Sequence, residues 1–169
     1  MREVKHMDHR HIRFSDRHEE VDLEQLQKLL RSGAFWAKER TLAGMAIAIA
    51  NSKPVVTVWD GAQLIGHARA TSDGIYRATI WDVVIDPNYR GAGLGRKLVQ
   101  TVLAHSNVCD VERVYLMTTH QQQFYEHIGF EQNSSTTLVL LNSGLDENFK
   151  GDCKFTTSEL TQLTSHSTY

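Results

Sequence analysis

A glycine-rich segment near the middle of the chain has the residue types of an anion-binding loop. Residues 90–96 read Arg-Gly-Ala-Gly-Leu-Gly-Arg and follow a mostly apolar, β-rich run at 79–85. Leu94, Leu98 and Val102 then recur at helical spacing, so the glycines lie where a helix begins. Free N–H groups and the helix dipole favour an anion there, and glycine allows close backbone approach. The segment predicts a polyanion site, with a plain helix-starting turn as the alternative.

The spacing of these glycines excludes two common phosphate-binding loops. The nicotinamide fingerprint G-x-G-x-x-G fails, because its last position falls on Arg96 counted from Gly91 and on Leu98 counted from Gly93. The nucleotide P-loop fails as well, because no Gly-Lys-Ser or Gly-Lys-Thr follows. The expected ligand is therefore a polyanion of another kind.

A second segment, residues 124–130, reads Phe-Tyr-Glu-His-Ile-Gly-Phe. Its Gly129 suits the end of a short helix, and the run at 113–117 reads as the strand before that helix. A tyrosine has a pKa near 10, so it is protonated at neutral pH and can donate a proton. Tyr125 is therefore a candidate general acid, and a packing residue at the helix start is the alternative.

Together these segments resemble the two signature motifs of the GCN5-related N-acetyltransferases (GNAT), over roughly residues 11–141. The resemblance implies an α+β fold: a central mixed, mostly antiparallel sheet with helices on both faces, in which splayed strands form the acetyl-CoA cleft. It implies an enzyme that transfers acetyl from acetyl-CoA to a primary amine by direct attack. It also implies the following cofactor-binding residues: Val83, Val84, Ile85, Arg90, Gly91, Ala92, Gly93, Leu94, Gly95, Arg96, Thr119 and Phe124.

Residues 68–73 and 78–83 resemble a narrower plastid and cyanobacterial branch that includes the plant-type serotonin N-acetyltransferases. The branch implies serotonin or a related arylalkylamine as acceptor, and a protein lysine or N-terminal amine as the alternative. Thr118 stands where plant members carry an aspartate proposed as the general base, and a threonine hydroxyl cannot take that role. A non-catalytic acetyl-CoA-binding sensor therefore stays open as a third hypothesis.

Two residues are candidates for the missing base. His120 titrates in the right range and lies near the start of the expected Tyr125 helix, and Asp82 could act through a chain of water molecules. Each has a structural alternative, as a surface histidine or as an aspartate that bonds a neighbouring loop. Phe35 and Trp36 could bind an aromatic amine, although the sequence favours them as core residues.

Composition limits the remaining classes. The chain has 169 residues, 41% of them hydrophobic, and a net charge of −2, which favours one domain and argues against nucleic-acid or membrane-surface partners. The longest apolar run, 42–50, is too short to cross a bilayer. We expect a cytoplasmic protein without a metal, acting on a small-molecule or protein amine; the resemblance also allows a homodimer.

The remaining patterns predict the elements that position these residues. Strands are expected at 11–14, 55–59, 63–70, 75–85 and 137–141, with a hairpin at Asp60-Gly61. Amphipathic helices are expected from Asp22 to Leu30, and after Thr41 with Met45 and Ile49 on one face. Residues 1–10 are expected to be a flexible arm, and the polar residues 142–169 a mobile tail.

Overall fold

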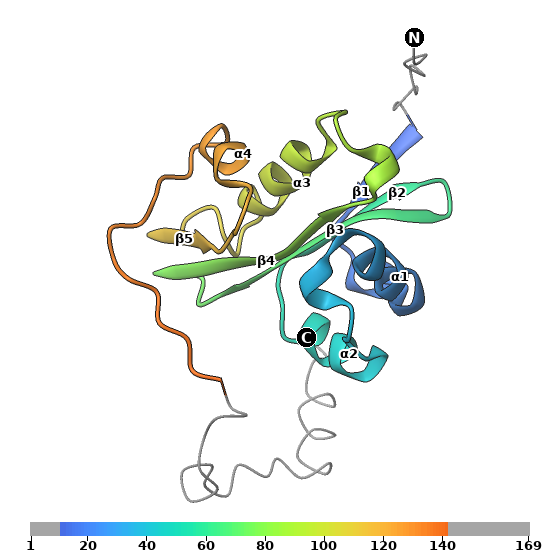
Figure 1. The fold of residues 1–169 in the computed structure, drawn as a ribbon, viewed down its shortest axis with the longest axis horizontal. Coiled ribbons are helices and arrows are strands. Elements are labelled where there is room, and N and C mark those ends of the chain that lie inside the picture. Colours follow the sequence, from blue (N-terminus) through green and yellow to red (C-terminus); the bar gives the residue numbers. More distant parts are fainter. Residues whose placement is uncertain (1–10, 142–169) are drawn as a thin grey trace, which may run out of the picture. The chain divides into compact units, whose positions relative to one another are not determined.

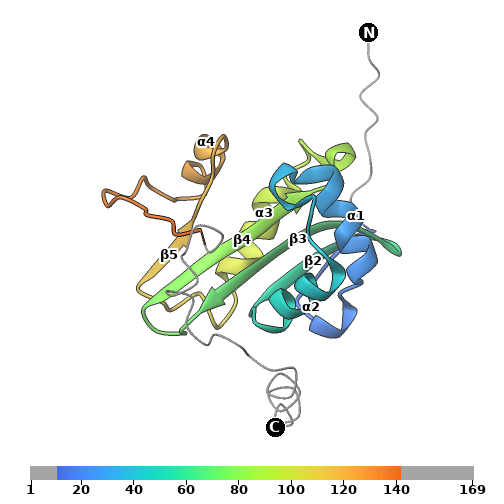
Figure 2. The same cartoon turned by 60° about the horizontal axis from the view of Figure 1, so that its bottom comes forward.

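The five strands form one sheet in the order β1-β2-β3-β4-β5 in the computed structural model, which describes residues 11–141 (Figures 1 and 2). Neighbouring strands run antiparallel except for β4 and β5, which are parallel. This confirms the predicted mixed, mostly antiparallel sheet. The strands are β1 (Ile12–Ser15), β2 (Val55–Asp60), β3 (Gln63–Ser72), β4 (Arg77–Ile85) and β5 (Arg113–Leu116). The helices are η2 (His18–Glu20), α1 (Leu23–Gly33), η3 (Phe35–Ala37), α2 (Leu42–Ala50), η4 (Pro87–Tyr89), α3 (Leu94–Leu103) and α4 (Gln122–Glu126).

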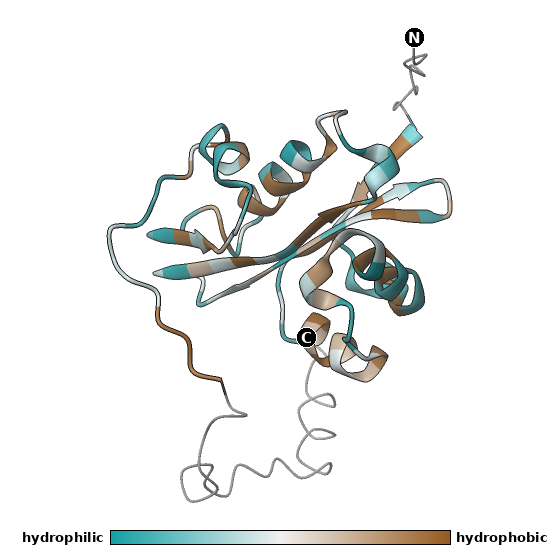
Figure 3. Ribbon diagram, viewed as in Figure 1, coloured by the Kyte–Doolittle hydropathy of each residue, from teal (hydrophilic) through white to brown (hydrophobic). Residues whose placement is uncertain are grey.

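The sheet separates two apolar clusters, so helices cover both faces as expected. On one face, Leu98, Val99 and Val102 of α3 pack against the sheet, and residues of α4 pack against the same cluster. On the other face, Leu26 and Leu30 of α1 pack with residues of α2 and of the sheet. Figure 1 shows α3 and α4 on one side of β4 and α1 and α2 on the other, and Figure 3 shows the apolar side of α3 toward the sheet.

Side-chain caps begin the two helices of the second face, at the residues that the sequence indicates. The Asp22 carboxylate accepts hydrogen bonds from Glu24 N and Gln25 N, each at 3.0 Å. Thr41 Oγ1 accepts from Gly44 N at 3.1 Å. These bonds satisfy N–H groups that the helices cannot pair internally, which fixes where α1 and α2 start.

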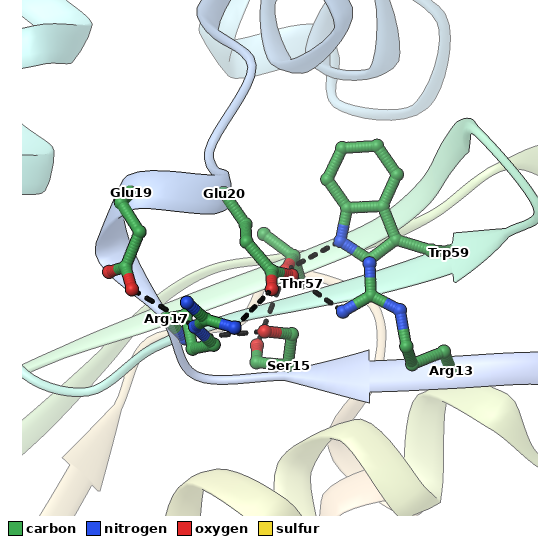
Figure 4. A network of polar contacts seen from close by, with 7 residues as sticks. All are labelled: Arg13, Ser15, Arg17, Glu19, Glu20, Thr57 and Trp59. Carbon is green, nitrogen blue, oxygen red and sulfur yellow. Dashed lines mark hydrogen bonds and ion pairs between the residues drawn. The ribbon is translucent and has the colours of Figure 1, made fainter.

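Polar contacts fasten β1 and the turn after it to the sheet (Figure 4). Thr57 Oγ1 donates to Ser15 O at 3.2 Å and accepts from the Trp59 indole at 2.9 Å. Arg13 reaches Glu20 of η2 at 2.5 Å. Because Thr57 and Trp59 are buried, their paired polar atoms avoid the cost of unsatisfied groups. This network holds the sheet edge far from β5.

Strand β4 contains one extra residue relative to β3. Arg69 lies opposite Trp81 and His67 lies opposite Val84, so two residues of β4 share the place opposite Ala68. This is a β-bulge, which bends a strand and re-aims its side chains. The first of the two residues, Asp82, has a positive φ of 55°. Aspartate tolerates that left-handed region better than most non-glycine residues.

The parallel pairing of β4 with β5 stops just before this bulge. Its last pair joins Ile80 to Leu116, so among the described residues the stretch from Trp81 to Ile85 pairs with β3 alone. Strand β5 ends at Leu116, so the bulge of β4 lies in the part of the strand that has no partner on that side among the described residues.

One expectation about the fold needs correction, and two others concern residues that the structure does not describe. Residues 137–141 form no strand, and the exposed fractions of Leu138 to Leu141 are 65–88%. The predicted strand at 137–141 was therefore wrong. This stretch belongs to the second of the two compact units into which the chain divides after Phe130. The expected arm, 1–10, and tail, 142–169, lie outside the described residues. Within 11–141 no helix has the length and apolarity needed to cross a membrane.

Candidate functional site

The glycine loop has the backbone that the anion-binding hypothesis requires. Gly91 and Gly93 have φ values of 84° and 77°, a region that costs an L-residue roughly 1–2 kcal/mol. Gly93 is the N-cap of the ten-residue helix α3, and no side chain caps that end. The first N–H groups of α3 are therefore available to a ligand, and the helix dipole favours an anionic one.

The space in front of these two glycines is open. A Cβ atom built on Gly91 or Gly93 would meet no heavy atom within 4 Å. Gly95 differs, because its Cβ would lie 3.5 Å from Phe124 Cζ in ordinary contact. The structure thus brings the first turn of α3 against the first aromatic residue of the second motif. Leu94 is buried in the core, so it can offer a ligand only its backbone.

The two arginines that flank the loop are bonded to backbone carbonyls. Arg90 donates from Nε to Ile85 O at 3.1 Å and from Nη2 to Gly33 O at 3.2 Å. Arg96 donates from Nη2 to His127 O at 2.9 Å. These bonds tie the loop to the end of β4, to α1 and to α4. Both guanidinium groups are exposed, so their positive charge still lies beside the loop.

Tyr125 lies in α4 and packs against the cluster on the α3 face. Its ring makes edge-on contacts with Phe124 and Phe130, at centroid distances of 4.9 and 5.9 Å. Burial raises the pKa of the Tyr125 phenol above its ordinary value. The hydroxyl therefore stays protonated at neutral pH, as a proton donor must.

The residues before α4 form a turn. Thr118 Oγ1 accepts a hydrogen bond from Gln121 N at 3.1 Å, so this threonine closes the turn that precedes α4. Gln122 Nε2 donates to the carbonyl of Thr119 at 3.1 Å. His120 is exposed, and within the described residues no hydrogen bond joins it to Tyr125. Its role as a base stays a prediction.

Asp82 lies on the opposite face of the sheet, in an ion-pair cluster. Its carboxylate accepts from Arg40 Nη1 at 2.6 Å and from Arg69 Nε at 2.8 Å, and only 5% of its side chain is exposed. Burial alone would raise the pKa of Asp82, but the hydrogen bonds and charges of the two arginines outweigh it and lower that pKa. A carboxylate with a lowered pKa is a weak base, so this geometry favours a structural role over proton abstraction.

His67, which sequence reasoning missed, lies beside Asp82. Its side chain is 1% exposed, and Nδ1 lies 3.3 Å from the carbonyl oxygen of Asp82. Burial lowers the pKa of His67 to about 4, so the ring is neutral at physiological pH. A histidine within the apolar run of β3 was the available signal.

Phe35 and Trp36 are not core residues, so the favoured sequence interpretation was wrong. They are 66% and 52% exposed and contact each other edge-on at 5.1 Å. Ala34 and Ala37 take the buried positions of this segment instead. Neither aromatic residue lines the pocket beside Asp82, so a role in acceptor binding stays a prediction.

Strand β4 contributes residues both to the face that carries the glycine loop and Tyr125 and to the face that carries the Asp82 ion-pair cluster. Val83 packs against the cluster on the α3 face, where the glycine loop, Phe124 and Tyr125 also lie. Val84 and Asp82 face the other side, where Asp82 meets Arg40 and Arg69. The arrangement offers an anion site and a proton donor on one face and a charged pocket on the other, with the bulge between them.

Comparison with known proteins agrees with this geometry. Residues 8–130 match the model of the acetyltransferase (GNAT) family. Two soybean proteins, the probable acetyltransferase TAP2 and the histone acetyltransferase TAP1, are each 36% identical over 124 residues, which cover 66% of this chain and 49% and 53% of theirs. The chain thus spans about half the length of these curated relatives.

A solved acetyltransferase of the same family, from Xanthomonas campestris, superposes with a TM-score of 0.68 at 25% identity. That alignment covers 77% of this chain and 94% of the bacterial one. The bulged strand, the left-handed glycine loop and the match over most of the chain agree, and the chain belongs to the acetyltransferase (GNAT) family.

Proposed function

We propose that this protein transfers the acetyl group of acetyl-CoA to a primary amine by direct attack. The observation that carries the proposal is the uncapped start of α3 behind the left-handed glycines Gly91 and Gly93. Such a helix start suits a pyrophosphate, and it comes after η4 and the end of β4, whose pairing with β5 stops at Ile80. Membership of an acetyltransferase family supports the same donor.

Several parts of the chain would hold acetyl-CoA. The backbone of residues 91–95 would bind the pyrophosphate, and the positive charge of Arg90 and Arg96 would favour it. The unpaired side of β4, at Val83 and Val84, would bind the pantetheine arm and polarise the thioester carbonyl. Acetyl-CoA supplies an activated acetyl group.

The protein's own residues would manage the protons. A primary amine with a pKa near 10.4 is mostly protonated at pH 7, so a base must expose its lone pair before attack. The amine nitrogen then bonds to the acetyl carbon to give a tetrahedral intermediate. As that intermediate collapses, the C–S bond breaks and the nitrogen releases its second proton to solvent. Tyr125 would donate its phenolic proton to the leaving sulfur and recover one from solvent. His120 is the remaining candidate base, because the lowered pKa of Asp82 makes that carboxylate a weak one.

The first acceptor class in this proposal is the arylalkylamines, such as serotonin. The pocket beside Asp82 supports it, because apolar residues of α1 and α2 make up much of its lining. A protein lysine or N-terminal amine is the second class, favoured by the name of the soybean histone acetyltransferase at 36% identity.

The test is the release of CoA thiol from acetyl-CoA in the presence of a panel of amines. The panel holds serotonin, tryptamine, a polyamine, a lysine peptide and a peptide with a free N-terminus. Rapid release with any amine supports the proposal, and the preferred amine assigns the acceptor class. Silence across the panel, with acetyl-CoA bound tightly, would leave the sensor hypothesis in its place.

A further inference from the structure

A pocket of about 430 Å³ lies between α1, α2 and the bulge of β4. Its volume falls in the range of roughly 300–1,000 Å³ that is typical of small-ligand sites. Leu26, Leu30, Met45 and Ile49 form much of its wall. Charged residues, among them Arg40 and Asp82, also line it. A ligand here would have an apolar body and at least one polar group.

Arg40 is the lining cation with the most free hydrogen-bonding capacity. Its guanidinium carries five N–H donors, of which one bonds Asp82 at 2.6 Å, and no second side-chain bond of Arg40 occurs among the described residues. Arg69, in contrast, is committed to Asp82 through Nε and to Ser52 Oγ through Nη1. The Arg40 side chain is 36% exposed, so a ligand can reach it. A guanidinium with free donors in a fork matches a carboxylate.

The charge of the pocket favours an anionic group near Arg40. Two cations, Arg40 and Arg69, meet one buried anion, Asp82, whose side chain is 5% exposed. Glu39 also lines the pocket but is exposed, so water screens its charge strongly. The cluster of Asp82 with Arg40 and Arg69 therefore carries an excess of one positive charge, and Arg40 is its exposed cation.

The buried side chain of His67 is a second, independent sign that a ligand group belongs in this pocket. It lines the same pocket, and its Nε2 is buried without a hydrogen-bond partner among the described residues. Buried polar atoms are nearly always paired, so an unpaired one points to a water or ligand group that completes the site. If Nδ1–H donates to the carbonyl of Asp82, Nε2 is left as an acceptor for an N–H group.

We propose that this pocket binds the acceptor of the acetyl transfer as an amine that also carries a carboxylate, with Arg40 as the carboxylate-binding residue. The inference rests on the proposed transfer of acetyl to a primary amine, and it replaces the arylalkylamine acceptor with apolar α-amino acids. The apolar side chain would lie against α1 and α2. The carboxylate would accept hydrogen bonds from Arg40, and the amine would remain near the bulge of β4.

Two matched acceptor pairs test the role of the carboxylate in the wild-type protein. Tryptophan is compared with tryptamine, and leucine with 3-methylbutylamine, because each pair differs only in that group. A hydrogen-bonded carboxylate should favour the amino acid by about tenfold to a hundredfold in kcat/KM, mainly through KM. Equal or faster turnover of the decarboxylated amines would overturn the proposal.

Variants of Arg40 test the assignment of the residue. Arg40→Met should lower the preference for tryptophan over tryptamine by at least about tenfold, mainly through a higher KM for tryptophan. Arg40→Lys should restore part of the effect, because it keeps the charge but loses the fork. Arg31→Met is the matched control, since Arg31 is an exposed arginine in the last turn of α1. A well-folded Arg40→Met protein that keeps the preference for tryptophan would overturn the assignment.

The binding of tryptophan and tryptamine to the CoA-bound protein, measured by calorimetry, separates this inference from the proposed function. Preferential tryptophan binding without turnover would retain the pocket and remove the proposed reaction. Binding of neither compound, or stronger binding of tryptamine, would overturn the pocket assignment, even if another amine were acetylated.

Discussion

Replacing Asp82 with asparagine tests whether its ion pairs stabilise the bulge of β4. The carboxylate bonds two arginines, one from β3 and one from the segment before α2. Asparagine keeps one carbonyl oxygen and tolerates the positive φ of 55°. The substitution therefore removes the charge without adding backbone strain.

The expected loss follows from the burial of the three partners. Removing one member of a fully buried ion pair costs roughly 3–5 kcal/mol, because the partner charge is left uncompensated. Here Asp82 and Arg69 are 5% and 14% exposed, but Arg40 is 36% exposed and keeps part of its hydration. We expect Asp82→Asn to lower the free energy of unfolding by about 2–3 kcal/mol, which corresponds to about 4–12 °C in Tm.

Thermal and urea unfolding, followed by circular dichroism, measure this loss. Glu19→Gln is the control, since its ion pair with Arg17 is 66% and 64% exposed and should give no measurable change. The contribution of Asp82 also depends on pH. Its pKa is lowered in the folded protein, so the stabilisation is present above the ordinary carboxylate pKa of about 4 and disappears as the pH falls through the folded value.

The difference between wild type and Asp82→Asn should therefore shrink on acidification below about pH 4. An Asp82→Asn protein as stable as wild type at pH 7 would refute the reasoning. So would a difference between the two proteins that grows as the pH falls.

Three further substitutions test the other parts of the site and the core. Gly93→Ala should lower the free energy of unfolding by about 1–2 kcal/mol, because an L-residue is strained at the φ of 77°. The added Cβ meets no heavy atom within 4 Å, so steric overlap does not contribute. The variant should also bind acetyl-CoA more weakly in a calorimetric titration. Tyr125→Phe should keep the affinity for acetyl-CoA but lower kcat by about a hundredfold or more, and full activity would remove the general-acid assignment. Gly66→Ala should destabilise the protein by roughly 1–3 kcal/mol in urea unfolding, because its Cβ would lie 2.7 Å from Ile85 Cδ1 and 2.9 Å from Val58 Cγ2. A Gly66→Ala protein with wild-type stability would show that the β3–β4 packing relaxes freely.

Local patterns predicted the elements on the α3 face because their signals lie close together in the sequence. The spacing of Leu94, Leu98 and Val102 predicted α3, and all three residues are buried. The glycines before that helix predicted a loop that an anion can approach closely, and the positive φ values of Gly91 and Gly93 agree with it. Short-range periodicity and turn chemistry are sufficient for such features.

The charged cluster depends on contacts that no local pattern contains. Arg40 and Asp82 are 42 residues apart in the chain, and only tertiary packing brings them together. Burial also decides the fate of apolar residues in a way that periodicity does not. Leu42 and Ile47 of α2 remain 40% and 51% exposed, although the whole helix is apolar. The predicted strand at 137–141 was wrong for a related reason, since β-propensity alone does not provide a partner strand.

The bulge also changes which face of the sheet the side chains of β4 occupy on either side of it. Ile80 and Ile85 both pack against the cluster on the α3 face, although five positions of a regular strand would place them on opposite faces. Without Asp82, Val83 would lie opposite Ala68, and every later side chain would keep its present face. Asp82 is thus an insertion in an otherwise regular strand. The residues that specify the sheet and the residue that shapes the site can therefore change independently during evolution.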